Sequence, residues 1–267
     1  MQVNDDFLPL STLPASLHTA TQSAWKRLRE ALAQADNVAE MTKQELPSSN
    51  WQGLSEQRRE ALAKVLTIST FALDTLVRYP QWLAELDIAG ELDVNPGRDE
   101  LASWLSESLE SAEDEEAMQR VIRRFRRKRM LGIIWRDLNR ASGHSMWSTA
   151  TAVSELAEIC LEAALTWLER FYAPRWGLPA PRKDGTPQRL VILGMGKLGA
   201  GELNLSSDID LIFAFPEKGE TQGGRKPLEH QEYLGCHDRR WLRLPCRYAL
   251  AAFGRRRAAG GLFCHAL

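Results

Sequence analysis

Apolar residues recur every three or four positions through the first two-thirds of the chain, which is the spacing of one buried face of an α-helix. The last of these stretches carries Val153, Leu156, Ile159 and Cys160 in one such stripe. Proline, glycine and serine residues mark the points where helices should begin or end. The pattern predicts helices over residues 16–37, 55–80, 80–89, 100–111, 113–141 and 147–176.

The pattern changes to that of β-strands after a connector rich in proline and glycine, residues 177–188. Residues 190–193 form a short apolar run that ends at a glycine, which is typical of a buried strand. A second strand should follow, because apolar residues alternate with Asp208 and Asp210 and would leave both aspartates on the opposite face. The apolar set is Ile209, Leu211, Phe213 and Phe215. We therefore expect an α+β fold, with a helical array over residues 1–176 followed by a mixed sheet.

Composition indicates a globular chain without a membrane segment. An apolar content of 44% in 267 residues is enough for a sizeable core. A net charge of −1 gives no general attraction to nucleic acid or to a membrane. No apolar run approaches the ~18 residues of a membrane span, and the N-terminus carries Asp5 and Asp6 rather than a basic leader region. The expected location is cytoplasmic, with no nucleic-acid or membrane partner.

The two aspartates are the clearest indication of chemistry. Two carboxylates placed two residues apart on one strand repel each other, so the arrangement favours a cation between them. Mg²⁺ takes hard oxygen ligands and often completes its shell with substrate phosphates. Asp208 and Asp210 are therefore the predicted metal-binding and catalytic residues.

The glycine-rich turn before the aspartates has to be weighed against two other motifs. Gly194, Gly196 and Gly199 spell the G-x-G-x-x-G of dinucleotide-binding folds. That fold needs a crossover connection of at least ~10–12 residues and a parallel strand, whereas about two helical turns fit before Ser207. A P-loop is excluded because Lys197 lacks the required glycine pattern and no serine or threonine follows it. The order of strand, glycine turn, serines and Asp-x-Asp indicates a nucleotidyltransferase, in which turn amides and a serine hold phosphates and aspartates hold metal.

Residues 194–213, Gly-Met-Gly-Lys-Leu-Gly-Ala-Gly-Glu-Leu-Asn-Leu-Ser-Ser-Asp-Ile-Asp-Leu-Ile-Phe, resemble the signature of the bacterial bifunctional glutamine synthetase adenylyltransferase/adenylyl-removing family. The resemblance extends back to about Ser16 and forward to about Gly224. That family carries two nucleotidyltransferase domains, and the helical lead-in resembles the N-terminal, adenylyl-removing one. The resemblance implies a polymerase β-like core over residues 189–234 that is incomplete in this chain.

The resemblance also implies a site and a reaction. Mg²⁺ would be held by the two aspartates, and phosphate would attack the phosphorus of an adenylylated tyrosine in glutamine synthetase, releasing ADP. The implied partners are glutamine synthetase, the PII signal protein, nucleotide (ATP or ADP) and phosphate. Lys197 would either touch phosphate or lie in solvent at the turn. The implied nucleotide-binding positions are Gly194, Gly196, Lys197, Gly199, Ser206 and Ser207.

Two other functions stay open at the level of sequence. One is a nucleotidyltransferase that adds adenylyl groups, consuming ATP and releasing pyrophosphate. The other is a non-catalytic helical module that docks on glutamine synthetase or a PII-type regulator. Binding that survives replacement of both aspartates would favour the docking module.

The tail over residues 235–267 differs from the rest of the chain. From Cys236 onward Asp238 is the single acidic residue and lysine is absent, while the cysteine and histidine spacings match no zinc pattern. A nucleotide string encoding residues 240–250 and the residue before them can be read one base displaced as Ala-Asp-Gly-Phe-Val-Tyr-Arg-Val-Asp-Met-Arg. The family has Phe-Val-Tyr-Arg-Val-Asp-Met-Arg in its next strand, where the aspartate is the third metal carboxylate. We infer an out-of-frame tail without that carboxylate, and hence a weak or inactive enzyme; sequencing the coding DNA checks the frame.

Three features of the helical part favour structural roles. The basic run over residues 120–129 is expected to be a solvated helix face opposed by the acidic residues 113–116, with contact to an acidic partner or to nucleotide phosphate left open. The tryptophans of this part fall mostly on apolar stripes, which favours core packing over stacking on bases. His144 lies in a loop and is expected to be incidental rather than catalytic.

Overall fold

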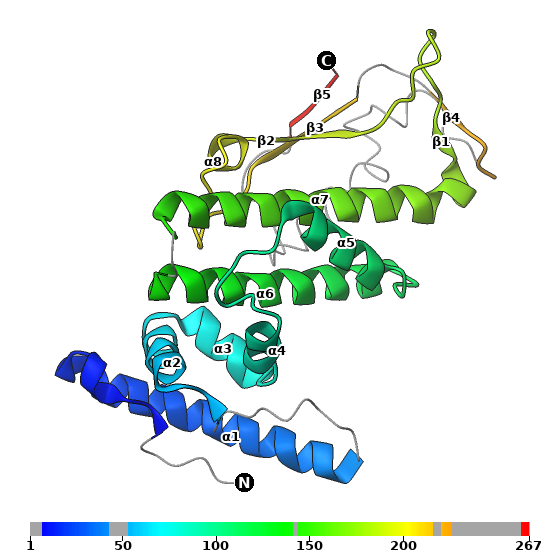
Figure 1. Ribbon diagram of the computed structural model, residues 1–267. Helices are drawn as coiled ribbons and strands as arrows, with labels where there is room; N and C mark the ends of the chain where they lie inside the picture. Colours follow the sequence, from blue (N-terminus) through cyan, green and yellow to red (C-terminus); the bar gives the residue numbers. More distant parts are fainter. Residues whose placement is uncertain (1–6, 43–52, 141–143, 216–219, 226–262, 267) are drawn as a thin grey trace. The chain divides into compact units, whose positions relative to one another are not determined.

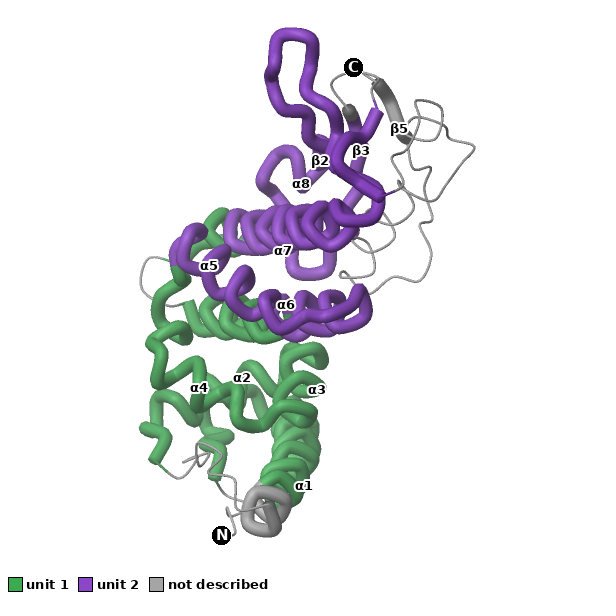
Figure 2. The backbone as a smooth tube through the Cα atoms, turned by 90° about the vertical axis from the view of Figure 1, so that its right-hand side faces the viewer, with its two compact units in different colours: residues 1–96, 127–149 green, residues 97–126, 150–267 purple. Residues whose placement is uncertain are grey.

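The computed structural model describes residues 7–42, 53–140, 144–215, 220–225 and 263–266. Helices dominate and short strands follow the last long helix (Figure 1), so the expected α+β fold is confirmed. The chain forms two compact units: unit 1 is residues 1–96 with 127–149, and unit 2 is residues 97–126 with 150–267 (Figure 2). The helices are η2 (Leu10–Thr12), η3 (Ala15–Leu17), α1 (His18–Thr42), α2 (Glu56–Ile68), α3 (Thr70–Arg78), α4 (Trp82–Ile88), α5 (Arg98–Leu109), α6 (Glu115–Asn139), α7 (Met146–Trp176) and α8 (Gly196–Gly199).

The core of unit 1 is built from the apolar stripes of its helices. Trp25 and Leu28 of α1 face the core with Leu62 of α2, and all three side chains are almost fully buried. Trp82 of α4 is also buried and stacks on Tyr79 with ring centroids 4.0 Å apart. Burial of such large apolar side chains is the main favourable term in folding, so this packing explains why apolar residues at helical spacing predict these helices.

Most helix ends differ by a few residues from the expected bounds, and one expected helix is divided into two. The sequence predicts a single helix over residues 55–80 with Ser69 on its apolar stripe, but α2 ends at Ile68 and α3 begins at Thr70. Ser69 has extended backbone angles of φ −114° and ψ 102°, and its hydroxyl accepts a hydrogen bond from the Ala72 N–H at 3.2 Å. A serine hydroxyl that satisfies a free N–H of the first turn is an N-cap. Helical spacing alone does not distinguish a cap from a position on the stripe.

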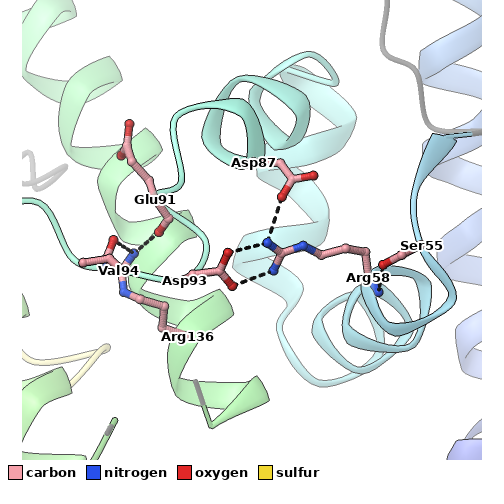
Figure 3. Close-up of polar contacts among 7 residues, drawn as sticks. All are labelled: Ser55, Arg58, Asp87, Glu91, Asp93, Val94 and Arg136. Carbon is pink, nitrogen blue, oxygen red and sulfur yellow. Dashed lines mark hydrogen bonds and ion pairs between the residues drawn. The ribbon is translucent and has the colours of Figure 1, made fainter. Parts of the chain in front are cut away.

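The loop between α4 and α5 is held from two sides by arginines (Figure 3). Arg58 of α2 donates hydrogen bonds from both terminal nitrogens to the Asp93 carboxylate, at 3.0 and 2.6 Å. It also forms an ion pair with Asp87 at 2.9 Å. Hydrogen bonding from Arg58 lowers the pKa of Asp93 from its ordinary value. Arg136 of α6 is buried; it donates to the Glu91 carbonyl and to the Asn95 side chain, the latter at 2.6 Å. Burial lowers the pKa of Arg136 to about 10.

Unit 2 holds the strands of the sheet and the later part of α7. β2 (Val191–Gly194) pairs antiparallel with β3 (Leu211–Phe215), and β3 pairs parallel with β5 (Phe263–Ala266), which makes a mixed sheet. A dinucleotide-binding unit would join parallel neighbours through its crossover helix, so the antiparallel pairing of β2 with β3 confirms that the G-x-G-x-x-G pattern is not such a unit. β3 starts at Leu211 rather than at Ile209.

A second, two-stranded ribbon follows the end of α7. β1 (Leu178–Pro179) pairs antiparallel with β4 (Thr221–Gln222). Gly177 lies at the junction with φ +82°, and a Cβ on Gly224 would collide with the backbone of Trp176 and Gly177. α7 does end at Trp176, but the expected domain boundaries at residues 176, 188 and 234 stay predictions. Most of the tail over residues 235–267 lies outside the described residues, and β5 is the part of it that the structure describes.

Candidate functional site

The glycine turn connects β2 to the short helix α8 and depends on glycine at three positions. A Cβ on Gly194 would lie 2.8 Å from Cγ of Leu198, and a Cβ on Gly199 would collide with the Gly194 carbonyl oxygen. Gly196 adopts φ +55°, a left-handed conformation that favours glycine, and the space where its Cβ would point is open. Lys197 is exposed at the same turn. The sequence motif therefore encodes a tight bend whose outer surface is accessible.

A second turn connects the glycine turn to the aspartates. The Ser207 N–H donates to the Asn204 carbonyl at 3.1 Å, and the Asn204 N–H donates to the Ser207 hydroxyl at 3.2 Å. The Ser207 hydroxyl in turn donates to the side-chain oxygen of Asn204. Ser206 is exposed. Asn204, to which sequence spacing gives no role, thus closes this turn together with Ser207.

The two aspartates lie directly before β3 and are both exposed. Leu211 and Phe213, which follow them in alternation, are buried, as the sequence pattern predicts. The Met195 N–H donates to the Asp210 carbonyl at 2.9 Å, and Gly194 is in register with Leu211. The structure therefore brings the glycine turn and the Asp-x-Asp segment together at one end of the β2–β3 pair.

The donor set at this end of the sheet fits a divalent cation in part. Two exposed carboxylates offer hard oxygen ligands and leave room for the phosphate oxygens that Mg²⁺ commonly takes. Within the described part of the chain, no group of three histidine, cysteine or acidic side chains gathers as a metal site. The described carboxylates that could serve as ligands at this end of the sheet are those of Asp208 and Asp210.

Two residues of α7 anchor the strand region, Ser154 beside the aspartate segment and Glu169 at the opposite end of β2, and neither was selected from the sequence. Ser154 is buried, and its hydroxyl accepts a hydrogen bond from the Leu203 N–H at 3.1 Å. Glu169 binds the guanidinium of Arg189, just before β2, at 2.9 Å. A polar residue within the apolar stripe of α7 is the signal that could have identified Ser154.

The sequence profile of the glutamate-ammonia ligase adenylyltransferase family matches residues 59–236 of the chain. The chain belongs to this family. It is similar to the bifunctional glutamine synthetase adenylyltransferase/adenylyl-removing enzyme of Pseudomonas aeruginosa, with 42% identity over 84% of this chain and 22% of the relative. It is 41% identical to the enzyme of the same name from Pseudomonas syringae pv. tomato over 70% of this chain and 19% of that relative. The chain spans about a fifth of the length of these curated relatives.

The resemblance stated from the motif is thus confirmed as membership of the adenylyltransferase family. The family match ends at residue 236, next to residue 235, where the sequence predicts a change of reading frame. The out-of-frame tail itself stays a prediction.

None of the helices that the structure describes is long and apolar enough to cross a membrane.

His144 was expected to be an incidental loop residue, but in the structure both of its ring nitrogens lie at hydrogen-bond distance from hydroxyl groups. Its Nε2 lies 2.8 Å from the Thr149 hydroxyl, which donates to Asp137 at 2.6 Å, and its Nδ1 lies 3.2 Å from the Ser148 hydroxyl. Ser148 also exchanges hydrogen bonds with Ser145 at the start of α7. These partners form a capping network for α7 that lies within unit 1 and contains no residue of the Asp-x-Asp site.

His144 should make the stability of the folded chain depend weakly on pH. Burial is the main cause that lowers the pKa of His144 below its ordinary value of 6.5. The unfolded chain then binds the proton more readily than the folded chain does. The contribution of neutral His144 to the free energy of unfolding is therefore complete above pH 6.5 and is lost as the pH falls from there through the pKa of the folded state. We expect His144→Gln to reduce the difference between the free energies of unfolding at pH 7.5 and pH 5.5, measured in urea. If the difference is the same in the variant and in the unsubstituted chain, His144 is not a source of the pH dependence.

The basic run of this adenylyltransferase-family chain is largely paired rather than simply solvated. Arg120 pairs with Glu116 at 3.3 Å, as the acidic cluster led us to expect. Lys128 pairs with Glu85 at 2.6 Å and Arg129 with Glu91, both within unit 1. The expected solvated face therefore holds for Arg120, Arg123 and Arg124, which are exposed, whereas Lys128 and Arg129 connect α6 to α4 and to the turn that follows it.

The tryptophans mostly pack in the core, as expected. Trp25, Trp82, Trp135 and Trp167 are buried. Trp147 differs, because 63% of its surface is exposed at the start of α7. Trp51 lies outside the described residues.

Proposed function

We propose that this chain is the adenylyl-removing part of a glutamine synthetase adenylyltransferase/adenylyl-removing enzyme, with little activity of its own. Family membership and the names of the two Pseudomonas relatives support the choice of glutamine synthetase as substrate. The observation that carries the proposal is the exposed pair Asp208 and Asp210 beside a glycine turn on antiparallel strands. This arrangement suits transfer of a phosphoryl-linked group.

Asp208 and Asp210 would hold Mg²⁺, which supplies polarisation of the phosphoryl oxygens and neutralises developing charge when it is bound. The two residues would place two exposed carboxylates at the end of the β2–β3 pair, where a cation that they hold would stay accessible to the substrate phosphate. The reaction that we propose is attack by phosphate on the phosphorus of adenylyl-tyrosine, which breaks the bond to the tyrosine oxygen and releases ADP.

The accessible surface of the glycine turn would receive the charged end of the nucleotide. The absence of a side chain at Gly196 lets phosphate oxygens approach the backbone, while Gly194 and Gly199 keep the bend tight. Lys197 and Ser206, both exposed, would contact phosphate directly. The Ser207 hydroxyl is already bonded to Asn204, so Ser207 would act mainly by shaping the turn.

Low activity follows from the ligand count. With two carboxylates in place of three, the transition state loses one source of electrostatic stabilisation, and each such group is worth about 3 kcal/mol, or 10²–10³ in rate. Regulation by a PII protein and binding of ATP or ADP belong to the same proposal and would depend on the longer protein.

The experiment measures ADP formed from adenylylated glutamine synthetase with phosphate and Mg²⁺. We expect slow or undetectable turnover for this chain, and turnover at least about 100-fold faster when the tail from residue 235 is replaced by the in-frame continuation. Asp210→Asn in the restored chain should abolish ADP formation. Rapid turnover by the present chain would contradict the expected loss.

Two other outcomes would select the alternatives. Pyrophosphate release from ATP and unmodified glutamine synthetase would identify an adenylyl-adding enzyme. Binding of glutamine synthetase that is unaffected by Asp208→Asn and Asp210→Asn together, with no turnover in either direction, would identify a docking module.

A further inference from the structure

The segment that carries the two aspartates, residues 203–210, is held at three points, two of which are bonds to other parts of unit 2. Its last point is the bond from the Met195 N–H to the Asp210 carbonyl at 2.9 Å. Its middle point is the turn closed by Asn204 and Ser207. Its first point is Leu203, whose N–H is bonded to Ser154 of α7 at 3.1 Å. Of the three, this first point is made with a helix that lies far from the segment in sequence.

Ser154 is placed to accept this bond and no simple apolar residue could replace it. Its hydroxyl donates to the Ala150 carbonyl at 2.9 Å, the back-bond that a serine in a helix commonly makes. Because the hydroxyl proton is used in that bond, the oxygen lone pairs face Leu203 and act as acceptors. Both residues are 2% exposed, so water does not substitute readily for the serine oxygen.

We propose that Ser154 is a positioning residue, through which α7 sets where the Asp208 and Asp210 carboxylates stand relative to the glycine turn. In Figure 1 α8 lies beside the beginning of α7 and the strands β2 and β3 extend along that helix from there, and the bond joins α7 to the connection between α8 and β3. Glu202 and Leu203 come directly after the glycine turn, which ends in Gly201 with φ +70°. A shift at Leu203 therefore moves the following turn and the first aspartate together.

The inference rests on the proposed metal site, so two measurements are needed, one for metal binding and one for the role of Ser154. Mn²⁺ serves as the probe for the Mg²⁺ site, with its affinity measured by electron paramagnetic resonance, and amide hydrogen exchange of residues 203–210 is measured on the metal-free chain. Ser154→Ala removes the acceptor and leaves a buried N–H without it. We expect about tenfold weaker Mn²⁺ binding, comparable to the smaller losses found when groups that orient a metal ligand are removed. Exchange of residues 203–210 should accelerate by about the same factor.

Ile159→Val is the matched control, because it removes a buried methyl group from the same helix without touching the bond. It should leave Mn²⁺ affinity and local exchange at the values of the unsubstituted chain. Ser154→Thr keeps a hydroxyl that can make both bonds and should restore both quantities. If the extra methyl group of threonine does not fit and the Ser154→Thr protein does not fold, the comparison of Ser154→Ala with Ile159→Val is sufficient by itself.

Each outcome has a defined meaning. If Ser154→Ala leaves exchange of residues 203–210 unchanged, or changes it no more than Ile159→Val does, the positioning role is refuted. If the unsubstituted chain binds no Mn²⁺, or Asp208→Asn with Asp210→Asn does not weaken binding, the proposed metal site fails. The exchange data on the metal-free chain then still decide whether Ser154 fixes the segment.

Discussion

Replacing Gly199 by alanine should destabilise unit 2 by about 2–3 kcal/mol and disrupt the candidate site, because the new Cβ would overlap the Gly194 carbonyl oxygen. The clash is with backbone rather than with the end of a flexible side chain, so it is relieved only if β2 and α8 separate. Since Gly194 ends β2 in register with Leu211, that movement would also displace the segment before β3. Urea unfolding of the chain, followed by far-ultraviolet circular dichroism, measures the loss.

Gly196→Ala is the control for this experiment. Gly196 has φ +55° but open space where its Cβ would point, so alanine there adds backbone strain of about 1–2 kcal/mol without a collision. The site should keep its Mn²⁺ affinity within about threefold in this variant, whereas Gly199→Ala should lose measurable binding. Equal effects of the two substitutions would mean that the turn tolerates the collision and that the close approach of Gly199 to Gly194 is not required.

Removing both carboxylates should abolish stabilisation of the chain by Mg²⁺. A ligand that binds the folded state alone adds about 2.7 kcal/mol at 100 times its dissociation constant. Mg²⁺ at saturating concentration should therefore raise the melting temperature of the unsubstituted chain and leave that of the Asp208→Asn, Asp210→Asn variant unchanged. Differential scanning fluorimetry at several Mg²⁺ concentrations measures both melting temperatures.

Glu162→Gln provides the matched control, because it removes one exposed carboxylate of α7 that is not one of the two proposed metal ligands. Its melting temperature should rise with Mg²⁺ as much as that of the unsubstituted chain. A similar rise in the double aspartate variant would place the cation elsewhere and would remove the basis of the proposed chemistry.

Local patterns were sufficient to predict most of the helices and the strands β2 and β3, but β2 is not the buried strand that its apolar run predicts, because Val191 and Leu193 are exposed. The stripe of α7, which includes Leu156 and Cys160, is buried as helical spacing requires. The short distance between Gly199 and Ser207 excluded a crossover helix, and the antiparallel pairing of β2 with β3 agrees. These features depend on residues that are near one another in sequence, where spacing and the geometry of the chain leave few choices.

The sequence by itself determined that this protein is an α+β chain with an Asp-x-Asp segment after a glycine turn, and the order of those residues placed it in its family. The tertiary structure decided what polar side chains do. Ser69 caps a helix, Ser207 closes a turn, and Ser154 reaches Leu203 across 49 positions of sequence. The physical reason is that a hydroxyl can satisfy a local carbonyl, a local N–H or a distant one at similar energy, so its partner is set by which backbone groups the fold leaves buried without one.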